Sequence, residues 1–357
     1  MNSESQTSGN PGSLNVKAHH LTLYHNDGDL VVSAPNGVGG STFYRIHRFM
    51  LSIHSYVFRD MFTLPPAADG SIETYDGVPI VHLPDSAEDM DGLLNVLYDP
   101  SRILFNKYDP CAPAKISGVL KLARKYDFTN LRLRTIEHYI QAWPSTLHEW
   151  DLLEQTIGVW RPDPDNDDEI EFLDAVFPEP GAAIRLAREC DIPQILPSAF
   201  YHLSRLLQQD DWNIHHDWND PDNDTYALSN GRRTARWDLL CLEDYRCLAR
   251  GREKMDEFML SLSKRTFRVG VKCNDAVKAK CAANCEQLIN QMRQRSRESR
   301  DVLAAMLYCE SLPGSLEADA ELCHRCCFAF TFGLSRKRKE LWEKIPEMFN
   351  LPSRQSE

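Results

Sequence analysis

The stretch from Phe43 to Phe62 shows two hydrophobic periodicities in succession. Phe43 to Ile46 has the short, β-prone composition of a strand, and from Phe49 onward the apolar residues recur at the spacing of a helix. Ser55 interrupts the helical part, and a serine side chain can accept hydrogen bonds from the free N–H groups at a helix start. The pattern therefore predicts a strand followed by a helical hairpin, which needs packing partners on both sides.

The residues around this hairpin predict an α+β domain. Predicted strands lie at 21–33, in two pieces around a turn at 26–29, and at 79–83. Predicted helices lie at 90–97, 116–126 and 133–140. Asp85 or Ser86 can cap the first of these helices, and Thr129 can cap the last. Because strands come early and paired helices follow, we expect a small sheet against a helical cluster at residues 19–145.

Beyond residue 145 the hydrophobic pattern is helical throughout, which predicts an all-α region. Predicted helices lie at 150–159, 184–190, 196–207, 237–251 and 255–264. Two acidic segments near 161–171 and 210–225 are expected to be solvated loops. Near the C-terminus Trp342, Ile345 and Phe349 share a helix face and should dock on the preceding helices.

These patterns predict five segments. They are a disordered tail at 1–18, the α+β domain at 19–145, a helical extension at 146–265, a cysteine-containing helical segment at 266–351 and a tail at 352–357.

Charge and composition narrow the function classes. The 357 residues include 40 Lys and Arg against 52 Asp and Glu, and the net charge of −12 argues against a sequence-independent grip on nucleic acid. No run approaches the roughly 18 apolar residues of a membrane helix, and the polar N-terminus lacks the features of a signal peptide. The odd count of 11 cysteines indicates a reducing compartment, either cytosol or nucleus, with free or metal-bound thiols.

Two basic runs lie in the C-terminal part. One is Arg336 to Lys339, and the other consists of arginines between Arg293 and Arg300. A short basic run can act as a nuclear import signal or contact a phosphate. We favour the simpler interpretation that both runs are solvated helix faces.

The strongest chemical signal is a set of C-terminal cysteines. Cys273 and Cys281 have the spacing C-x7-C, and Cys323 and Cys326 form C-x2-C. Two thiolate pairs can close the tetrahedral shell of a structural zinc ion and link segments far apart in sequence. Cys285 is an alternative ligand one turn after Cys281, and His324 or Cys327 could substitute in the second pair. The other interpretation is that these residues are free thiols packed as small hydrophobic groups.

The sequence offers no catalytic motif. It contains neither GxSxG nor HExxH, and it has no glycine-rich phosphate loop. We therefore predict a protein that is not an enzyme.

An ordered series of short motifs resembles the BTB/POZ domain over residues 21–143. The motifs are Asp29-Leu30-Val31-Val32, Ile46-His47-Arg48 with the hairpin after it, Val81-His82-Leu83-Pro84-Asp85, Leu94 with Leu97-Tyr98, and Leu122-Ala123-Arg124-Lys125-Tyr126. Further along, Ala183 to Glu189 and Ile195 to Tyr201 resemble the BTB proteins abundant in mushroom-forming (basidiomycete) fungi. Such proteins often carry paired cysteines in their C-terminal part, which favours a structural pairing here.

The resemblance implies an interaction protein that forms homo- or hetero-oligomers or docks a protein partner. In the family, domains pair through the N-terminal strand and helices, which implies a partner-binding set of Phe43, Ile46, His47, Phe49, Ile53, Phe58, Met61 and Phe62. A cullin scaffold, with a ubiquitin-ligase adaptor role, is a further partner that the resemblance implies, although no kelch or ankyrin repeat is present to read a substrate. The alternative is a nuclear regulator of transcription or chromatin assembled through the same domain.

Overall fold

The computed structural model of the chain describes residues 17–65, 72–103, 106–160, 172–216, 228, 231–271, 273–312 and 322–352. The chain divides into two compact units. Unit 1 comprises Met1–Asn106 and Ala112–Tyr139, and unit 2 comprises Lys107–Cys111 and Ile140–Glu357. The acidic segment at 161–171, most of the one at 210–225 and most of the N-terminal tail lie outside the described residues.

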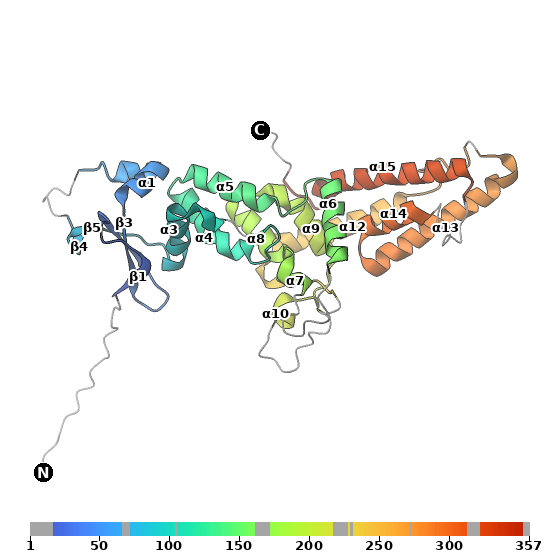
Figure 1. Cartoon of the computed structure of the whole chain (residues 1–357). Coiled ribbons are helices and arrows are strands. Elements are labelled where there is room, and N and C mark those ends of the chain that lie inside the picture. Colours follow the sequence, from blue (N-terminus) through green and yellow to red (C-terminus); the bar gives the residue numbers. More distant parts are fainter. Residues whose placement is uncertain are drawn as a thin grey trace, which may run out of the picture. The chain divides into compact units, whose positions relative to one another are not determined.

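Unit 1 contains a five-stranded mixed sheet (Figure 1). Its strands are β1 (Lys17–Tyr24), β2 (Leu30–Pro35), β3 (Ser41–Ile46), β4 (Thr74–Tyr75) and β5 (Val78–His82), in the order β1-β3-β2-β5-β4. β2 pairs with β3 in antiparallel register, with Leu30 opposite Ile46, whereas β1 is parallel to β3 and β5 is parallel to β2. β1 therefore forms one edge of the sheet.

The predicted helical hairpin follows β3 directly. It consists of α1 (Arg48–His54) and α2 (Tyr56–Met61), and the hydroxyl of Ser55 between them accepts a hydrogen bond from the N–H of Phe58 at 3.0 Å. This confirms the predicted cap. The hydroxyl of Ser55 also donates to the carbonyl of Tyr126, so the cap ties the hairpin to the helices that follow.

The remaining helices of unit 1 complete its core. They are α3 (Ala87–Tyr98), the 3-10 turn η1 (Pro100–Ile103), α4 (Ala112–Lys125) and α5 (Thr129–Ile140). Ser86 caps α3 by accepting from the N–H of Asp89, as one of the two predictions had it. The prediction for Thr129 was wrong, because α5 begins at this residue and its hydroxyl donates to Asp127. One buried cluster joins sheet, hairpin, α3 and α4, and it includes Val32, Tyr44, Leu51, Leu93 and Ala123.

The described part of unit 2 is almost wholly helical. Its first helices are α6 (Leu147–Val159), α7 (Leu173–Val176), α8 (Pro180–Cys190), η2 (Pro193–Ile195), α9 (Leu196–Ser204), α10 (Trp212–His215), η3 (Trp237–Leu239) and α12 (Leu242–Ser261). The predicted break after residue 251 is absent, since α12 runs through it. Gly251 instead allows a close crossing, because a Cβ atom there would lie 2.2 Å from the ring of Phe349.

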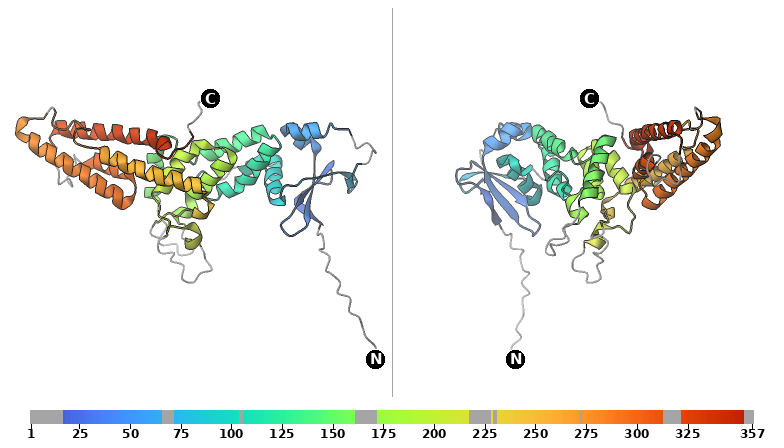
Figure 2. Two further views of the ribbon diagram at one scale, coloured as in Figure 1. Left: turned by 180° about the vertical axis from the view of Figure 1, so that it is seen from behind. Right: turned by 45° about the vertical axis from the view of Figure 1, so that its right-hand side comes forward.

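Three further helices continue unit 2, namely α13 (Asp275–Ser299), α14 (Val302–Ser311) and α15 (His324–Met348). α14 packs against both α13 and α15, and both views of Figure 2 show these orange and red helices running alongside one another. Ile345 and Phe349 are fully buried and Trp342 nearly so, which confirms their predicted docking. Of the described helices, none is both long and apolar enough to cross a membrane.

Two arginines in the predicted solvated runs bind groups elsewhere in the chain. Arg338 is buried and its guanidinium donates to both carboxylate oxygens of Asp151 and to the carbonyl of Leu303. Arg293 donates to the carbonyls of Leu260 and Leu262 at the end of α12, at 3.1 and 2.7 Å. The prediction was wrong for Arg338, because its guanidinium is buried against a carboxylate far away in the sequence, whereas Arg293 is half-buried and caps the end of α12.

One residue of the second predicted acidic loop is also buried. Asp210 is only 6% exposed, and its carboxylate accepts a hydrogen bond from the N–H of Leu207 at 2.7 Å. The next residue, Asp211, caps α10 by accepting from two N–H groups. The segment predicted as a solvated loop therefore begins with a buried carboxylate and the short helix α10, and its residues 217–225 lie outside the described part of the chain.

Candidate functional site

The first candidate site is the outer face of the α1–α2 hairpin. Its backbone is held at its start and at its middle: the N–H of Arg48 donates to Asp29 at 2.7 Å, and the hydrogen bonds of Ser55 fix the junction of the two helices. Leu51 and Phe58 point into the core of unit 1. The residues on the opposite side of each helix are thereby left at the surface.

The structure separates the eight predicted partner-binding residues into three groups. Phe43, Ile46 and Phe58 are buried, and Met61 and Phe62 are partly buried against the core. His47 is half-buried, and its Nδ1 lies 2.9 Å from the hydroxyl oxygen of Tyr98. Only Phe49 and Ile53 are well exposed, at 68% and 59%. We expected Phe43, Ile46 and Phe58 to contact a partner, and the structure corrects this expectation. Their side chains are buried within the chain itself and leave no surface for a partner.

Two apolar residues that the predicted set lacked complete the outer face. Tyr56 and Val57, in the first turn of α2, are 58% and 42% exposed. We define the hairpin surface as Phe49, Ile53, Tyr56 and Val57. Helical spacing in the sequence groups the residues of each helix into faces, but only the burial of Leu51 and Phe58 in the structure identifies the inner face and so the outer one.

The second candidate site is a cluster of four cysteines in unit 2. The Sγ atoms of Cys273, Cys281, Cys323 and Cys326 all lie within 4.8 Å of one another, and those of Cys273 and Cys323 are 3.6 Å apart. Four sulfurs at about 2.3 Å from a tetrahedral zinc ion stand about 3.8 Å apart, so the spacing is close to that of a zinc shell. The structure thus brings together the four residues of the predicted ligand set.

Local structure explains how these sulfurs converge. Cys273 lies just before α13 and Cys281 two turns into it, whereas Cys323 immediately precedes α15 and Cys326 lies in its first turn. The N–H of Gly270 donates to Sγ of Cys326, and the N–H of Cys323 donates to Sγ of Cys281, both at 3.4 Å. Backbone donors of this kind stabilise negative charge on sulfur and orient the ligands of a metal site.

The titration of Cys323 differs from that of Cys285. A hydrogen bond from the backbone of Cys326 lowers the pKa of the Cys323 thiol to about 7. Burial raises the pKa of Cys285 to about 12. Cys285 lies fully buried outside the four-sulfur cluster, which also leaves out the exposed His324 and the half-buried Cys327. The spacing of the sequence alone could not choose among these alternatives.

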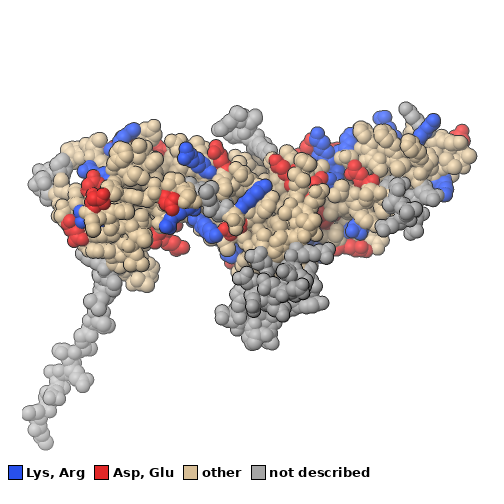
Figure 3. Space-filling view, in the orientation of Figure 1, with Lys and Arg blue, Asp and Glu red and all other residues tan. Residues whose placement is uncertain are grey.

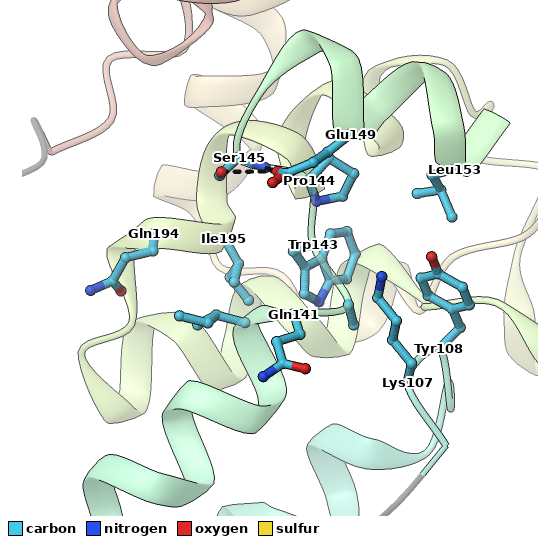
Figure 4. A pocket seen from close by; sticks show the side chains of 12 residues that line it. Lys107, Tyr108, Gln141, Trp143, Pro144, Ser145, Glu149, Leu153, Gln194 and Ile195 are labelled. Carbon is cyan, nitrogen blue, oxygen red and sulfur yellow. Dashed lines mark hydrogen bonds between the residues drawn. The ribbon is translucent and has the colours of Figure 1, made fainter.

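A pocket of about 470 Å³ lies in unit 2 (Figure 4). Its walls include Tyr108, Trp143 and Leu153. Its carboxylate, Glu149, is occupied by the N–H groups of Ser145 and Thr146 at the start of α6, and these bonds hold the pKa of Glu149 below its usual range. The pocket's acidic group is therefore a helix cap.

Charges are mixed over the face shown in Figure 3. Basic and acidic side chains are interspersed there, and neither gathers into one large patch. This distribution agrees with the net charge of −12 in giving no support to an electrostatic grip on nucleic acid.

Comparison with known protein families finds a match that covers most of unit 1, including the hairpin. Residues 29–142 match the family model of the BTB/POZ domain, which spans the strands from β2 onward, the hairpin and the helices up to α5. No curated protein matches the chain. The match, together with the mixed sheet and the helices that cover it, shows that the chain contains a BTB/POZ domain at residues 29–142, followed by an all-helical C-terminal region.

Proposed function

We propose that this chain is a non-enzymatic interaction protein that self-associates through the hairpin surface of its BTB/POZ domain. The domain is a protein-protein interaction module of a generally non-enzymatic fold. The observation that carries the proposal is the hairpin surface itself: four exposed apolar side chains on two helices that are anchored to the core beneath. A contiguous exposed apolar patch is typical of a protein interface.

The edge of the sheet supports the same proposal. β1 is an edge strand, and Leu21 within it is 99% exposed. An edge strand offers unpaired backbone groups to a strand from another chain. In a symmetric dimer each copy would contribute its hairpin surface and this strand, so every apolar residue counts twice.

Light scattering on the purified full chain tests self-association. We expect a mass of twice the 40.9 kDa chain for the native protein, and a shift toward one chain mass for Phe49→Asp with Ile53→Asp. Two charged residues per copy in a buried interface should cost about 2–4 kcal/mol, which weakens the dimer roughly 30-fold or more. Leu133→Asp, at a residue of α5 with 48% exposure, is the matched control. A native monomer, or equal dissociation by the control, contradicts the proposal.

Docking to a different protein is the other form of this proposal. The family resemblance supports a cullin scaffold, which would make the chain a ubiquitin-ligase adaptor. Recovery of a cullin with the native chain and its loss with the hairpin variant would support this role, and recovery that the variant leaves unchanged would place cullin contacts elsewhere. The alternative role as a nuclear regulator has less support, because the net charge is acidic and Arg338 of the basic run is buried. The odd count of eleven cysteines favours a reducing compartment, cytosol or nucleus.

We also propose that Cys273, Cys281, Cys323 and Cys326 hold one structural zinc ion. The support is the donor set: four sulfurs at zinc-like spacing, two of them accepting backbone N–H groups. An ion there would link α13 to the start of α15, joining Cys281 to Cys323, which lies 42 positions later in the sequence. Its role would be to stabilise the fold, since four protein ligands leave no open position for a substrate.

Metal analysis of the purified chain tests the zinc proposal. We expect one zinc per chain, lost in Cys326→Ser and kept in Cys327→Ser, which changes the neighbouring thiol outside the cluster. Removal of zinc by a chelator should lower the thermal unfolding midpoint of the native chain and leave that of Cys326→Ser unchanged. A metal-free native protein, or equal metal content in both variants, contradicts the proposal.

A further inference from the structure

The start of α15 forms a groove with the turn at 266–271, next to the cysteine cluster. Its volume is about 550 Å³, within the usual range of ligand sites. We propose that this groove docks an acidic, amphipathic segment of a partner protein. The site is separate from the hairpin surface, and the proposal goes beyond self-association.

Aromatic side chains give the groove an exposed apolar wall. Phe328 and Phe332 lie one turn apart on α15, are 66% and 63% exposed, and stack with ring centroids 5.9 Å apart. Val271, from the facing turn, is also exposed. Large apolar groups held in solvent in this way are the anchors that protein interfaces bury.

A close approach of two segments forms the floor. Gly333 faces Phe267, and a Cβ atom at Gly333 would lie 3.0 Å from Cδ1 of that ring. The ring of Phe267 also packs on Phe330, with centroids 4.9 Å apart, so both phenylalanines are buried beneath the groove. The exposed wall thus stands on a well-packed base and is held in place before any partner binds.

The polar lining of the groove is basic. Arg268, Arg325 and Arg336 line it, and none of its described lining residues is acidic. Within the described part of the chain, neither Arg268 nor Arg336 makes an ion pair, although the protein as a whole carries a net charge of −12. Cations beside exposed aromatic rings match a ligand that offers carboxylates next to apolar side chains.

An acidic peptide fits these features better than a nucleic acid does. Three cations are few for a backbone-tracking site, and the aromatic pair stacks on itself instead of presenting two free ring faces. Cys326 lines the groove and belongs to the cysteine cluster. If the proposed zinc is bound, it therefore fixes one wall of the groove.

Fluorescence anisotropy with a designed peptide tests the proposal on the full-length protein. The probe carries Leu and Phe at helical spacing i, i+3, i+4 and i+7 with Glu at the remaining positions, and its matched control has Lys in place of Glu. We expect the Glu peptide to bind at least about tenfold more tightly than the Lys peptide, with an affinity that falls as salt is added. Equal affinity for the two peptides overturns the proposal.

Variants locate the binding. Phe332→Ser should weaken the Glu peptide about tenfold or more, and Arg268→Gly roughly two- to fivefold. Arg268 has a φ of +52°, a conformation that glycine adopts without strain, so this variant removes a charge and leaves the fold intact. Arg297→Ala removes an exposed charge on α13 outside the groove and should have no effect.

The remaining controls separate this proposal from the others. The hairpin variant Phe49→Asp with Ile53→Asp should keep full peptide binding. A native protein that is monomeric and still binds the peptide contradicts only the self-association proposal. Chelation of zinc should weaken peptide binding if the cluster is loaded. Unchanged binding by a zinc-loaded protein would show that the ion does not fix a wall of the groove, and it would leave both the groove assignment and the zinc proposal standing. Two results overturn the groove assignment. One is full peptide binding by Phe332→Ser. The other is displacement of the peptide by a single-stranded oligonucleotide that binds the native protein but not Phe332→Ser.

Discussion

Replacing Arg338 with alanine should destabilise unit 2 far more than replacing its neighbour Lys339. Both residues belong to the basic run on α15, but their surroundings differ. The side chain of Arg338 is 6% exposed and pairs with both oxygens of Asp151, whereas that of Lys339 is 72% exposed. Nε of Arg338 also donates to the carbonyl of Leu303 at 3.0 Å, so one guanidinium connects α6, α14 and α15.

The magnitude follows from what the truncation leaves behind. Loss of one partner of a buried ion pair costs roughly 3–5 kcal/mol, because the other charge stays without compensation. The side chain of Asp151 remains 23% exposed and regains part of its hydration, which reduces the expected cost of Arg338→Ala to about 2–4 kcal/mol. Lys339→Ala should lie within about 0.5 kcal/mol of the native protein.

Urea unfolding followed by tryptophan fluorescence measures this difference. All seven tryptophans lie in unit 2, so the signal reports on this unit. The rings of Trp150, next to Asp151 in the sequence, and Trp342 contact each other in a tilted arrangement with centroids 5.6 Å apart. Asp151→Asn with Arg338→Ala should lose less stability than the sum of the single variants, since both remove the same interaction. An Arg338→Ala protein as stable as Lys339→Ala would refute the reasoning.

Two further predictions concern the same unit. Burial opposes the ionisation of Asp301, but the neighbouring Arg205 holds the pKa of this carboxyl below its usual range. The carboxylate therefore stabilises the fold above its unfolded pKa of about 3.9, and this contribution is lost as pH falls through the lower folded pKa. Unfolding midpoints measured from pH 7 down to pH 3 should fall less steeply for Asp301→Asn than for the native protein, and parallel curves would contradict the assignment. Gly251→Ala should lower the free energy of unfolding by about 1–3 kcal/mol, because the new methyl group overlaps the ring of Phe349. Gly158→Ala, whose Cβ atom would have no atom within 4 Å, should be neutral or stabilising by up to about 1 kcal/mol. The same urea assay compares the two variants, and equal effects would show that the crossing at Gly251 relaxes freely.

Features that depend on short stretches of chain could be predicted from the sequence. Ser55 was identifiable as a cap because the apolar spacing restarts after it, and the structure has the expected bond to Phe58. The four clustered cysteines form two short-range pairs, and the geometry of the chain brings the pairs together. The α+β domain followed by helices was likewise readable from the order of strand and helix patterns.

Features that depend on distant residues could not be predicted in this way. Arg338 looks solvated in a basic run, and only its contact with Asp151, 187 residues earlier, shows that it is buried. Periodicity placed Phe58 and Phe49 on one hairpin without saying which face the core would cover. Nothing in the spacing of Cys281 and Cys285 tells which of the two turns toward the other pair.

The path of the chain between the two units affects how the protein can be divided into fragments. The BTB/POZ match at 29–142 includes Lys107–Cys111, which packs within unit 2. Tyr108 in this segment packs against Phe177 in a tilted arrangement, with ring centroids 5.6 Å apart. A fragment cut to the limits of the family match would carry Tyr108 away from its packing partners and leave Phe177 uncovered in the remainder. A truncation at the limits of the family match would thus expose apolar surface on both of the resulting fragments.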